Sequence, residues 1–181
     1  MSLFGETRQV RALGDLFANV WQVAYVTHDL DRGMQTLRDR YGVENCTEVP
    51  TAGATFLKGD EAVDWQVRVA MGARGGLIVE LIEPVAGEVG FYRRFLPEDG
   101  SASLRLHHIA TQVPLGDDVW GALGDLLGGA GLRFDYAVLI PNRVRAGYID
   151  TTADLGHYLE VCQLQPADTE FFSSLIEERA R

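Results

Sequence analysis

Four polar residues have the types and the spacing of a metal-binding or acid–base site. Each lies in a β-branched, aromatic or apolar stretch that predicts a strand. Alternate side chains of a strand point to opposite faces, so Glu80 shares its face with Ile78 and Ile82. A carboxylate among apolar side chains on a covered face is costly without a partner, and a metal ion can be that partner. The four residues are Gln22, Glu80, His108 and Glu160.

Together these side chains offer two carboxylates, one imidazole and one amide oxygen. Such a mixed oxygen and nitrogen set suits one divalent ion, either Zn, Ni, Co, Mn or Fe(II), with positions left for water or substrate. Taken singly, Glu80 and Glu160 would be exposed strand carboxylates, and this alternative stays open.

The residues beside this set have open assignments. By strand alternation His107 points to the face opposite His108, although a register shifted by one residue would exchange them. Tyr158 shares the face of Glu160. It is a candidate for the substrate pocket, with a packed core tyrosine as the alternative.

An internal repeat supports the set more strongly than any single residue does. Residues 22–24 (QVA) correspond to residues 108–110 (HIA), and residues 78–81 (IVEL) correspond to residues 158–161 (YLEV). The spacing from Gln22 to Glu80 is 58 residues (80 − 22), and the spacing from His108 to Glu160 is 52 (160 − 108). The repeat predicts one structural unit used twice.

The strands and helices that must position these residues follow a βαβββ order in each half. The chain is therefore predicted to be an α+β protein of two tandem βαβββ modules, followed by an amphipathic helix that Asp168 caps. The predicted bounds are 17–85 for the first module, 86–103 for a linker with a short helix, 104–164 for the second module, and 165–181 for the C-terminal helix.

Composition excludes several classes of function. The formal charge is −10, from 26 acidic and 16 basic residues, which disfavours nucleic acid and anionic membrane surfaces as partners. Cys46 and Cys162 do not make a disulfide framework, so a reducing compartment is expected. No apolar run approaches the roughly 20 residues of a membrane span, and residues 1–17 do not resemble a secretory signal. We expect a cytoplasmic protein whose partner is a small molecule.

The repeated modules, with Gln or His on the first strand and Glu on the last strand of each half, resemble the vicinal-oxygen-chelate superfamily. This group includes glyoxalase I, methylmalonyl-CoA epimerase, extradiol dioxygenases and bleomycin-resistance proteins. The resemblance covers about residues 17–164, and its clearest motifs are residues 106–110 (LHHIA) and 156–160 (GHYLE). It implies the cup-shaped, barrel-like mixed sheet of the glyoxalase/bleomycin-resistance fold with a metal inside. It also implies the ligands Gln22, Glu80, His108 and Glu160, with Glu160 acting as a base.

Within this resemblance, the ligand set is similar to that of animal-type glyoxalase I. The positions where that enzyme has Arg and Asn for glutathione are Val26 and Pro84 here, so a glutathione adduct is not expected. Methylmalonyl-CoA epimerase has His first and Gln second, where this chain has Gln22 and Glu80. Gln22 also disfavours an extradiol dioxygenase, which needs two His ligands.

The resemblance implies a metal-dependent lyase or isomerase/epimerase that acts on a small carbonyl compound through an enediolate. The alternative is a non-catalytic protein of the same fold that binds or sequesters a small molecule. Because members of the superfamily often dimerise, a homodimer is expected.

Overall fold

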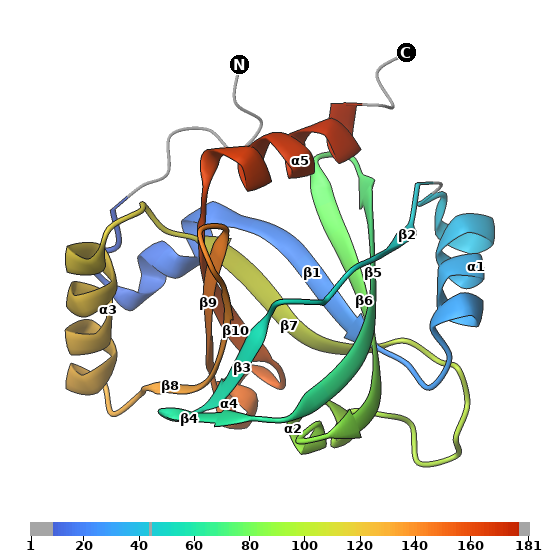
Figure 1. Cartoon of the computed structure of the whole chain (residues 1–181), viewed down its shortest axis with the longest axis horizontal. Coiled ribbons are helices and arrows are strands. Elements are labelled where there is room, and N and C mark those ends of the chain that lie inside the picture. Colours follow the sequence, from blue (N-terminus) through green and yellow to red (C-terminus); the bar gives the residue numbers. More distant parts are fainter. Residues whose placement is uncertain (1–8, 44, 178–181) are drawn as a thin grey trace.

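Ten strands form one mixed sheet that curls into a barrel (Figure 1). The computed structural model describes residues 9–43 and 45–177. The order of the strands in the sheet is β2-β5-β6-β1-β7-β10-β9-β8-β3-β4. The strands are β1 (Val20–Val26), β2 (Thr47–Val49), β3 (Thr55–Lys58), β4 (Glu61–Val63), β5 (Trp65–Arg74), β6 (Leu77–Gly87), β7 (Arg105–Gln112), β8 (Phe134–Ile140), β9 (Val144–Ile149) and β10 (Tyr158–Leu164).

Helices cover the outside and the ends of this sheet. They are the 3₁₀ helix η1 (Leu13–Asn19) and the helices α1 (Leu30–Tyr41), α2 (Gly90–Arg93), α3 (Asp117–Gly129), α4 (Thr152–Leu155) and α5 (Pro166–Glu177). None of the helices in the described ranges is long and apolar enough to cross a membrane.

The sheet contains the same four-strand arrangement twice. The first half has the order β1-β6-β5-β2, and the second half has the order β7-β10-β9-β8. Strand β1 pairs in parallel with β6, β7 pairs in parallel with β10, and the two halves join through antiparallel pairing of β1 with β7. The predicted α+β fold of two βαβββ units in a cup-shaped mixed sheet is confirmed.

A hairpin that the sequence analysis did not predict joins the first half of the chain to the edge strand of the second half. Strands β3 and β4 pair with each other, and β3 also pairs with β8 of the second half, with Phe56 opposite Val138. The ring of Phe56 is fully buried and stacks on Trp65 at 4.7 Å between ring centroids and on Tyr136 at 5.7 Å. The hairpin was missed because its two strands are only four and three residues long and pack against partners distant in sequence.

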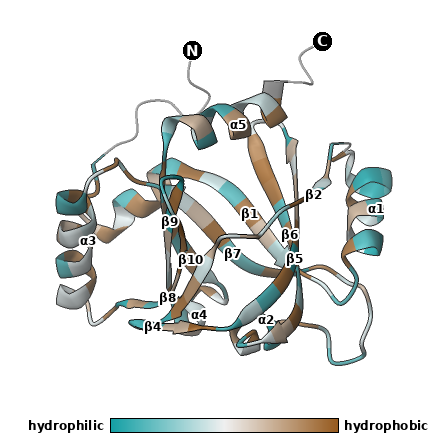
Figure 2. Cartoon of the chain, viewed as in Figure 1, coloured by the Kyte–Doolittle hydropathy of each residue, from teal (hydrophilic) through white to brown (hydrophobic). Residues whose placement is uncertain are grey.

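The two long helices α1 and α3 cover the outer face of the sheet and leave the inner face free (Figure 1). Helix α1 begins where the Asp29 side chain accepts a hydrogen bond from the Arg32 backbone N–H at 2.9 Å, and it buries Leu30 and Leu37. In Figure 2 the residues of α1 are mostly hydrophilic, as expected for a helix with one face in solvent. Helix α3 buries Leu123 and Leu127 against the second half in the same way.

The C-terminal helix α5 lies across one end of the barrel (Figure 1). It covers most of the predicted range 165–181, of which residues 178–181 lie outside the described residues. The expectation that Asp168 caps this helix is wrong. Asp168 lies inside the first turn, and its Oδ1 accepts a hydrogen bond from Arg143 Nε at 2.9 Å. Phe172 packs against Trp21 of β1 with the ring centroids 4.8 Å apart, so the helix is tied to the barrel by apolar contact.

Close packing between β9 and β8 predicts the effect of a small substitution. A Cβ atom at Gly147 would lie 2.5 Å from Cδ1 of Phe134, whose ring stacks on Trp120 at 4.7 Å. Because the ring has little room to move, we expect Gly147→Ala to lower the free energy of unfolding by about 1–3 kcal/mol, measured by urea denaturation.

The control for this prediction is Gly121→Ala in α3, where an added Cβ meets nothing within 4 Å. Alanine favours a helix over glycine, so this variant should be more stable than wild type by about 0.5–1 kcal/mol. Equal stability of the two variants would contradict the packing of Phe134 on Gly147.

Candidate functional site

The four residues singled out by the sequence come together on the inner face of the barrel. They lie on the adjacent strands β6, β1, β7 and β10, which are the centre of the sheet. Strand β1 pairs in parallel with β6, and β7 pairs in parallel with β10. Gln22 is therefore placed relative to Glu80 as His108 is placed relative to Glu160. All four side chains are buried, with exposed fractions of 3% for Gln22, 8% for Glu80, 0% for His108 and 6% for Glu160.

His108 links the two carboxylates. Its Nε2 atom lies 3.3 Å from Glu80 Oε2 and 3.2 Å from Glu160 Oε2. Gln22 Nε2 donates a hydrogen bond to Glu80 Oε2 at 2.9 Å and lies 3.4 Å from His108 Nε2. The alternative that these glutamates are exposed strand residues is therefore excluded.

Burial and charge act in opposite directions on these groups. Burial disfavours the charged form of His108, but Glu160 and Glu80 outweigh it and raise the pKa of His108 to about 9. Burial raises the pKa of Glu80 despite its contact with His108. Burial also opposes ionisation of Glu160, but the charge and hydrogen bond of His108 lower its pKa overall. The two carboxyls thus differ, with Glu160 the stronger acid and Glu80 the weaker one.

His107 lies beside His108 instead of on the opposite face. Strand β7 has a bulge here, since Ala24 pairs with His108 and Tyr25 pairs with Leu106. The bulge turns His107 inward and brings its Nδ1 to 2.9 Å from His108 Nδ1. The expectation that the two imidazoles face opposite sides is wrong, because strand alternation fails at a bulge.

Hydrogen bonding fixes which nitrogen of each ring carries hydrogen. His107 Nε2 lies 3.2 Å from the Phe91 carbonyl, which can only accept, so this nitrogen donates. Burial, and then the charge of His108, hold the pKa of His107 well below its usual range, so its Nδ1 is left as an acceptor for His108 Nδ1–H. The Nε2 of His108 is therefore the atom directed at the two carboxylates.

Two residues that the sequence analysis did not select complete the surroundings of Glu160. The Tyr148 hydroxyl and the Cys162 thiol both bond to this carboxylate and contribute to its lowered pKa. Tyr148 lies directly opposite Glu160 in the β9/β10 ladder. Strand alternation places Cys162 on the same face as Glu160. The position of Tyr148 depends on the register between β9 and β10, which the sequence does not show.

A cavity of about 440 Å³ opens onto this site. Gln22, Glu80 and Glu160 line one part of it, and most of its remaining wall is apolar. Ligand pockets of this size and character are common in enzymes and binding proteins. A small molecule in this cavity would reach both carboxylates.

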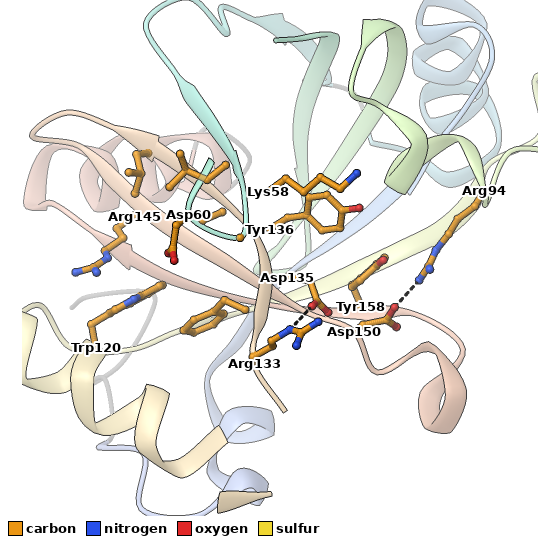
Figure 3. Close-up of a pocket in the computed structure, with 15 residues that line it drawn as sticks. Lys58, Asp60, Arg94, Trp120, Arg133, Asp135, Tyr136, Arg145, Asp150 and Tyr158 are labelled. Atoms are coloured by element: carbon orange, nitrogen blue, oxygen red, sulfur yellow. Dashed lines mark hydrogen bonds and ion pairs between the residues drawn. The ribbon is translucent and has the colours of Figure 1, made fainter. Parts of the chain in front are cut away.

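Tyr158, the candidate pocket residue, lines a different and larger pocket of about 1030 Å³ (Figure 3). Its ring packs against Phe91 at 5.0 Å between centroids and beneath Arg94. Most charged groups of this pocket are already paired, as in Arg94 with Asp150 at 3.1 Å and Arg133 with Asp135 at 2.9 Å. The smaller cavity with the buried carboxylates is therefore the better candidate for chemistry.

In the described ranges, no group of three or more His, Cys, Asp and Glu side chains is arranged as a ready metal site. The side chains of the candidate site bond to one another instead, with His108 between the carboxylates.

Solved structures share this architecture. Methylmalonyl-CoA epimerase from Mycobacterium tuberculosis matches with 20% identity and a TM-score of 0.58, over 83% of this chain and 91% of that one. The curled sheet of two βαβββ units decides the classification. The chain has the vicinal-oxygen-chelate fold.

Other proteins of the vicinal-oxygen-chelate fold give similar matches. A Streptomyces coelicolor methylmalonyl-CoA epimerase variant in complex with 2-nitronate-propionyl-CoA has 20% identity and a TM-score of 0.54, over 81% of this chain and 94% of that one. A hypothetical protein from Bacillus halodurans has 17% identity and a TM-score of 0.51 over the same shares of the chains. No protein-family model and no curated protein matches the sequence. At these identities the likeness establishes the fold.

The hydrogen-bond arrangement predicts that two neighbouring histidines differ in protonation. In chelator-treated protein, ¹⁵N NMR of the imidazoles between pH 5 and 8 should find His108 doubly protonated and His107 neutral, with hydrogen on Nε2. On raising the pH, His108 should lose its Nε2 proton near pH 9. A His108 ring that is neutral at pH 7 would contradict the ion pairs with the glutamates.

Proposed function

We propose that this protein is a metal-dependent epimerase or isomerase that moves a proton at the carbon next to a carbonyl group. The observation that carries the proposal is the pair of buried glutamates with opposite pKa shifts on the wall of an apolar cavity. Pairs of titratable groups whose surroundings drive their pKa values apart are typical of acid–base catalysis.

The separations of the four donor side chains fit one divalent ion. Neighbouring ligands about 2.1 Å from an ion lie about 3.0–3.4 Å apart in octahedral or tetrahedral geometry. In the structure His108 Nε2 lies 3.2 and 3.3 Å from the two glutamates, within this range, and the Gln22 amide nitrogen lies 2.9 Å from Glu80, just below it. We propose that Gln22, Glu80, His108 and Glu160 hold the ion once His108 loses its Nε2 proton and the Gln22 amide turns its oxygen inward.

When bound, a divalent ion in this position would supply Lewis acidity toward the oxygen of the substrate carbonyl. Glu160 would take the proton from the carbon, because its lowered pKa keeps it ionised, and Tyr148 and Cys162 orient it by hydrogen bonds. Glu80, whose pKa is raised by burial, would return a proton in its neutral form, when it is not bound to the ion. The glutamates come from strands β6 and β10 of different halves. This supports removal of a proton from one side of the carbon and its return to the other side.

The structural neighbours support this class of reaction. Their names describe methylmalonyl-CoA epimerases, and one is a complex with methylmalonyl-CoA and NH4+. We propose a carbonyl compound or thioester as the substrate class, and not a glutathione adduct, since Val26 and Pro84 occupy the positions of glutathione-binding residues in the glyoxalase resemblance.

Bound metal tests the ligand assignment. Protein purified without chelators, or incubated with Zn, Ni, Co or Mn, should carry one ion per chain by elemental mass spectrometry. His108→Ala should lose most of it, because the remaining donors are two carboxylates and an amide. The control is His28→Ala, which removes an exposed imidazole that bonds the Pro97 carbonyl and should leave the metal content unchanged. Equal metal in both variants would overturn the ligand set.

Proton exchange tests the base. In D2O, wild-type protein should introduce deuterium at the carbon next to the carbonyl of a suitable substrate, followed by NMR with methylmalonyl-CoA and other 2-branched thioesters as the panel. Glu160→Gln should slow exchange by roughly 100-fold or more, because the amide cannot accept the proton. The control Glu61→Gln removes an exposed carboxylate of β4 and should exchange at the wild-type rate. A Glu160→Gln variant that exchanges at the wild-type rate would exclude this residue as the base.

A second function, non-catalytic binding of an apolar small molecule, is favoured by the apolar wall of the 440 Å³ cavity. A fold does not by itself imply activity. The binding function would be supported if the purified protein carried a stoichiometric organic ligand and no metal, and catalysed no deuterium exchange.

A further inference from the structure

The cavity of the carboxylate pair extends away from them to helix α5. Met71, Ala146 and Leu164 of the inner sheet face line it, together with Phe172 and Leu175 of the helix. Helix α5 follows the last strand of the second βαβββ unit and closes one end of the barrel (Figure 1). The chamber between the carboxylates and this helix is thus mostly apolar.

A buried carboxylate interrupts the mostly apolar wall near the helix. Asp168 lines the cavity and is only 2% exposed. Its Oδ1 is bonded by Arg143, but its Oδ2 is buried with no hydrogen-bond partner among the described residues. A buried acceptor without a partner is costly, so the atom is suited to accept a hydrogen bond from a ligand.

The charges along the cavity restrict what that ligand can carry. Arg143 is the single cation among the described residues that line it, and it is already paired with Asp168. The other ionisable groups on the wall are carboxylates, two neutral tyrosines and one thiol. An anionic group at the far end would face the Asp168 carboxylate, whereas an N–H or O–H donor could bond to its unpartnered Oδ2.

We propose that the chamber under α5 binds the apolar tail of the substrate and that Asp168 selects tails ending in a hydrogen-bond donor. The substrate class is therefore a carbonyl compound with a tail of several methylene groups and a terminal hydroxyl, amide or amine. This inference rests on the proposed function for the position of the carbonyl group, and it assigns the specificity to a helix outside the two repeated modules.

Hydroxamates test the chamber, because they offer two vicinal oxygens to a metal and can carry an alkyl chain of any length. Binding to zinc-loaded protein is measured by calorimetry with acetohydroxamate and hexanohydroxamate. The longer tail should increase affinity by about 100-fold if it enters an apolar chamber. Leu175→Trp, which fills the chamber, should remove this gain and leave the affinity for acetohydroxamate unchanged. Equal affinity of the two hydroxamates for wild type would overturn the chamber.

The end of the tail tests Asp168. Wild type should bind 6-aminohexanohydroxamate, a donor, at least 10-fold more tightly than 5-oxohexanohydroxamate, an acceptor. In Asp168→Asn the amide oxygen can keep the bond from Arg143, while the amide nitrogen replaces Oδ2 and donates, so the preference should reverse. Glu170→Gln, an exposed change in the same helix, should behave as wild type. An unchanged preference in Asp168→Asn would overturn the role of this carboxylate.

Failure of the metal site can be separated from failure of the chamber. If acetohydroxamate does not bind, the proposed function loses its metal. The chamber is then tested by NMR titration with hexylamine and 2-hexanone, which need no metal. Preference for hexylamine in wild type and for 2-hexanone in Asp168→Asn would retain the inference, and no binding of either compound would overturn it. If Asp168→Asn does not fold, the effect of Leu175→Trp on tail length decides.

Discussion

Two carboxylates buried inside one sheet require a cation between them, and His108 supplies it. Glu80 and Glu160 approach from opposite halves of the barrel, and both contact the same nitrogen. Removing one member of a buried charged group leaves the others uncompensated, which is far more costly than losing a surface ion pair. The inner face of strands β6, β1, β7 and β10 is therefore organised around one imidazole.

The internal repeat explains why residues of different types occupy equivalent positions in this buried site. In each half a first strand pairs in parallel with the last strand, so one position of each faces the barrel interior at the same level. The two halves then join edge to edge through β1 and β7, which places Gln22 beside the acid–base group of the second half. Symmetry of the backbone thus creates a site whose side chains are asymmetric, an amide on one side and an imidazole on the other.

Sequence patterns predicted the elements and the faces well. The internal repeat and strand alternation were enough to bring Gln22, Glu80, His108 and Glu160 together, because both depend on local periodicity. What they missed depends on pairing between distant strands. The bulge that turns His107 inward, the position of Tyr148 opposite Glu160, and the β3–β4 hairpin are all properties of register. The role of Asp168 was also misjudged, since its partner Arg143 lies on a segment 25 residues away.

The hairpin of residues 55–63 ties the first half of the chain to the second, and this has a consequence for how the protein is made. Its strand β3 finds its second partner only when β8, at residues 134–140, has left the ribosome. Until then the first half has an open edge with unpaired backbone groups, which is the kind of surface that pairs with other chains. Lys58 and Glu61 at the tip of the hairpin, both charged and exposed, reduce that hazard during synthesis. Pairing of this hairpin with β8 is thus a late, long-range event, expected to limit the folding rate more than the formation of either module.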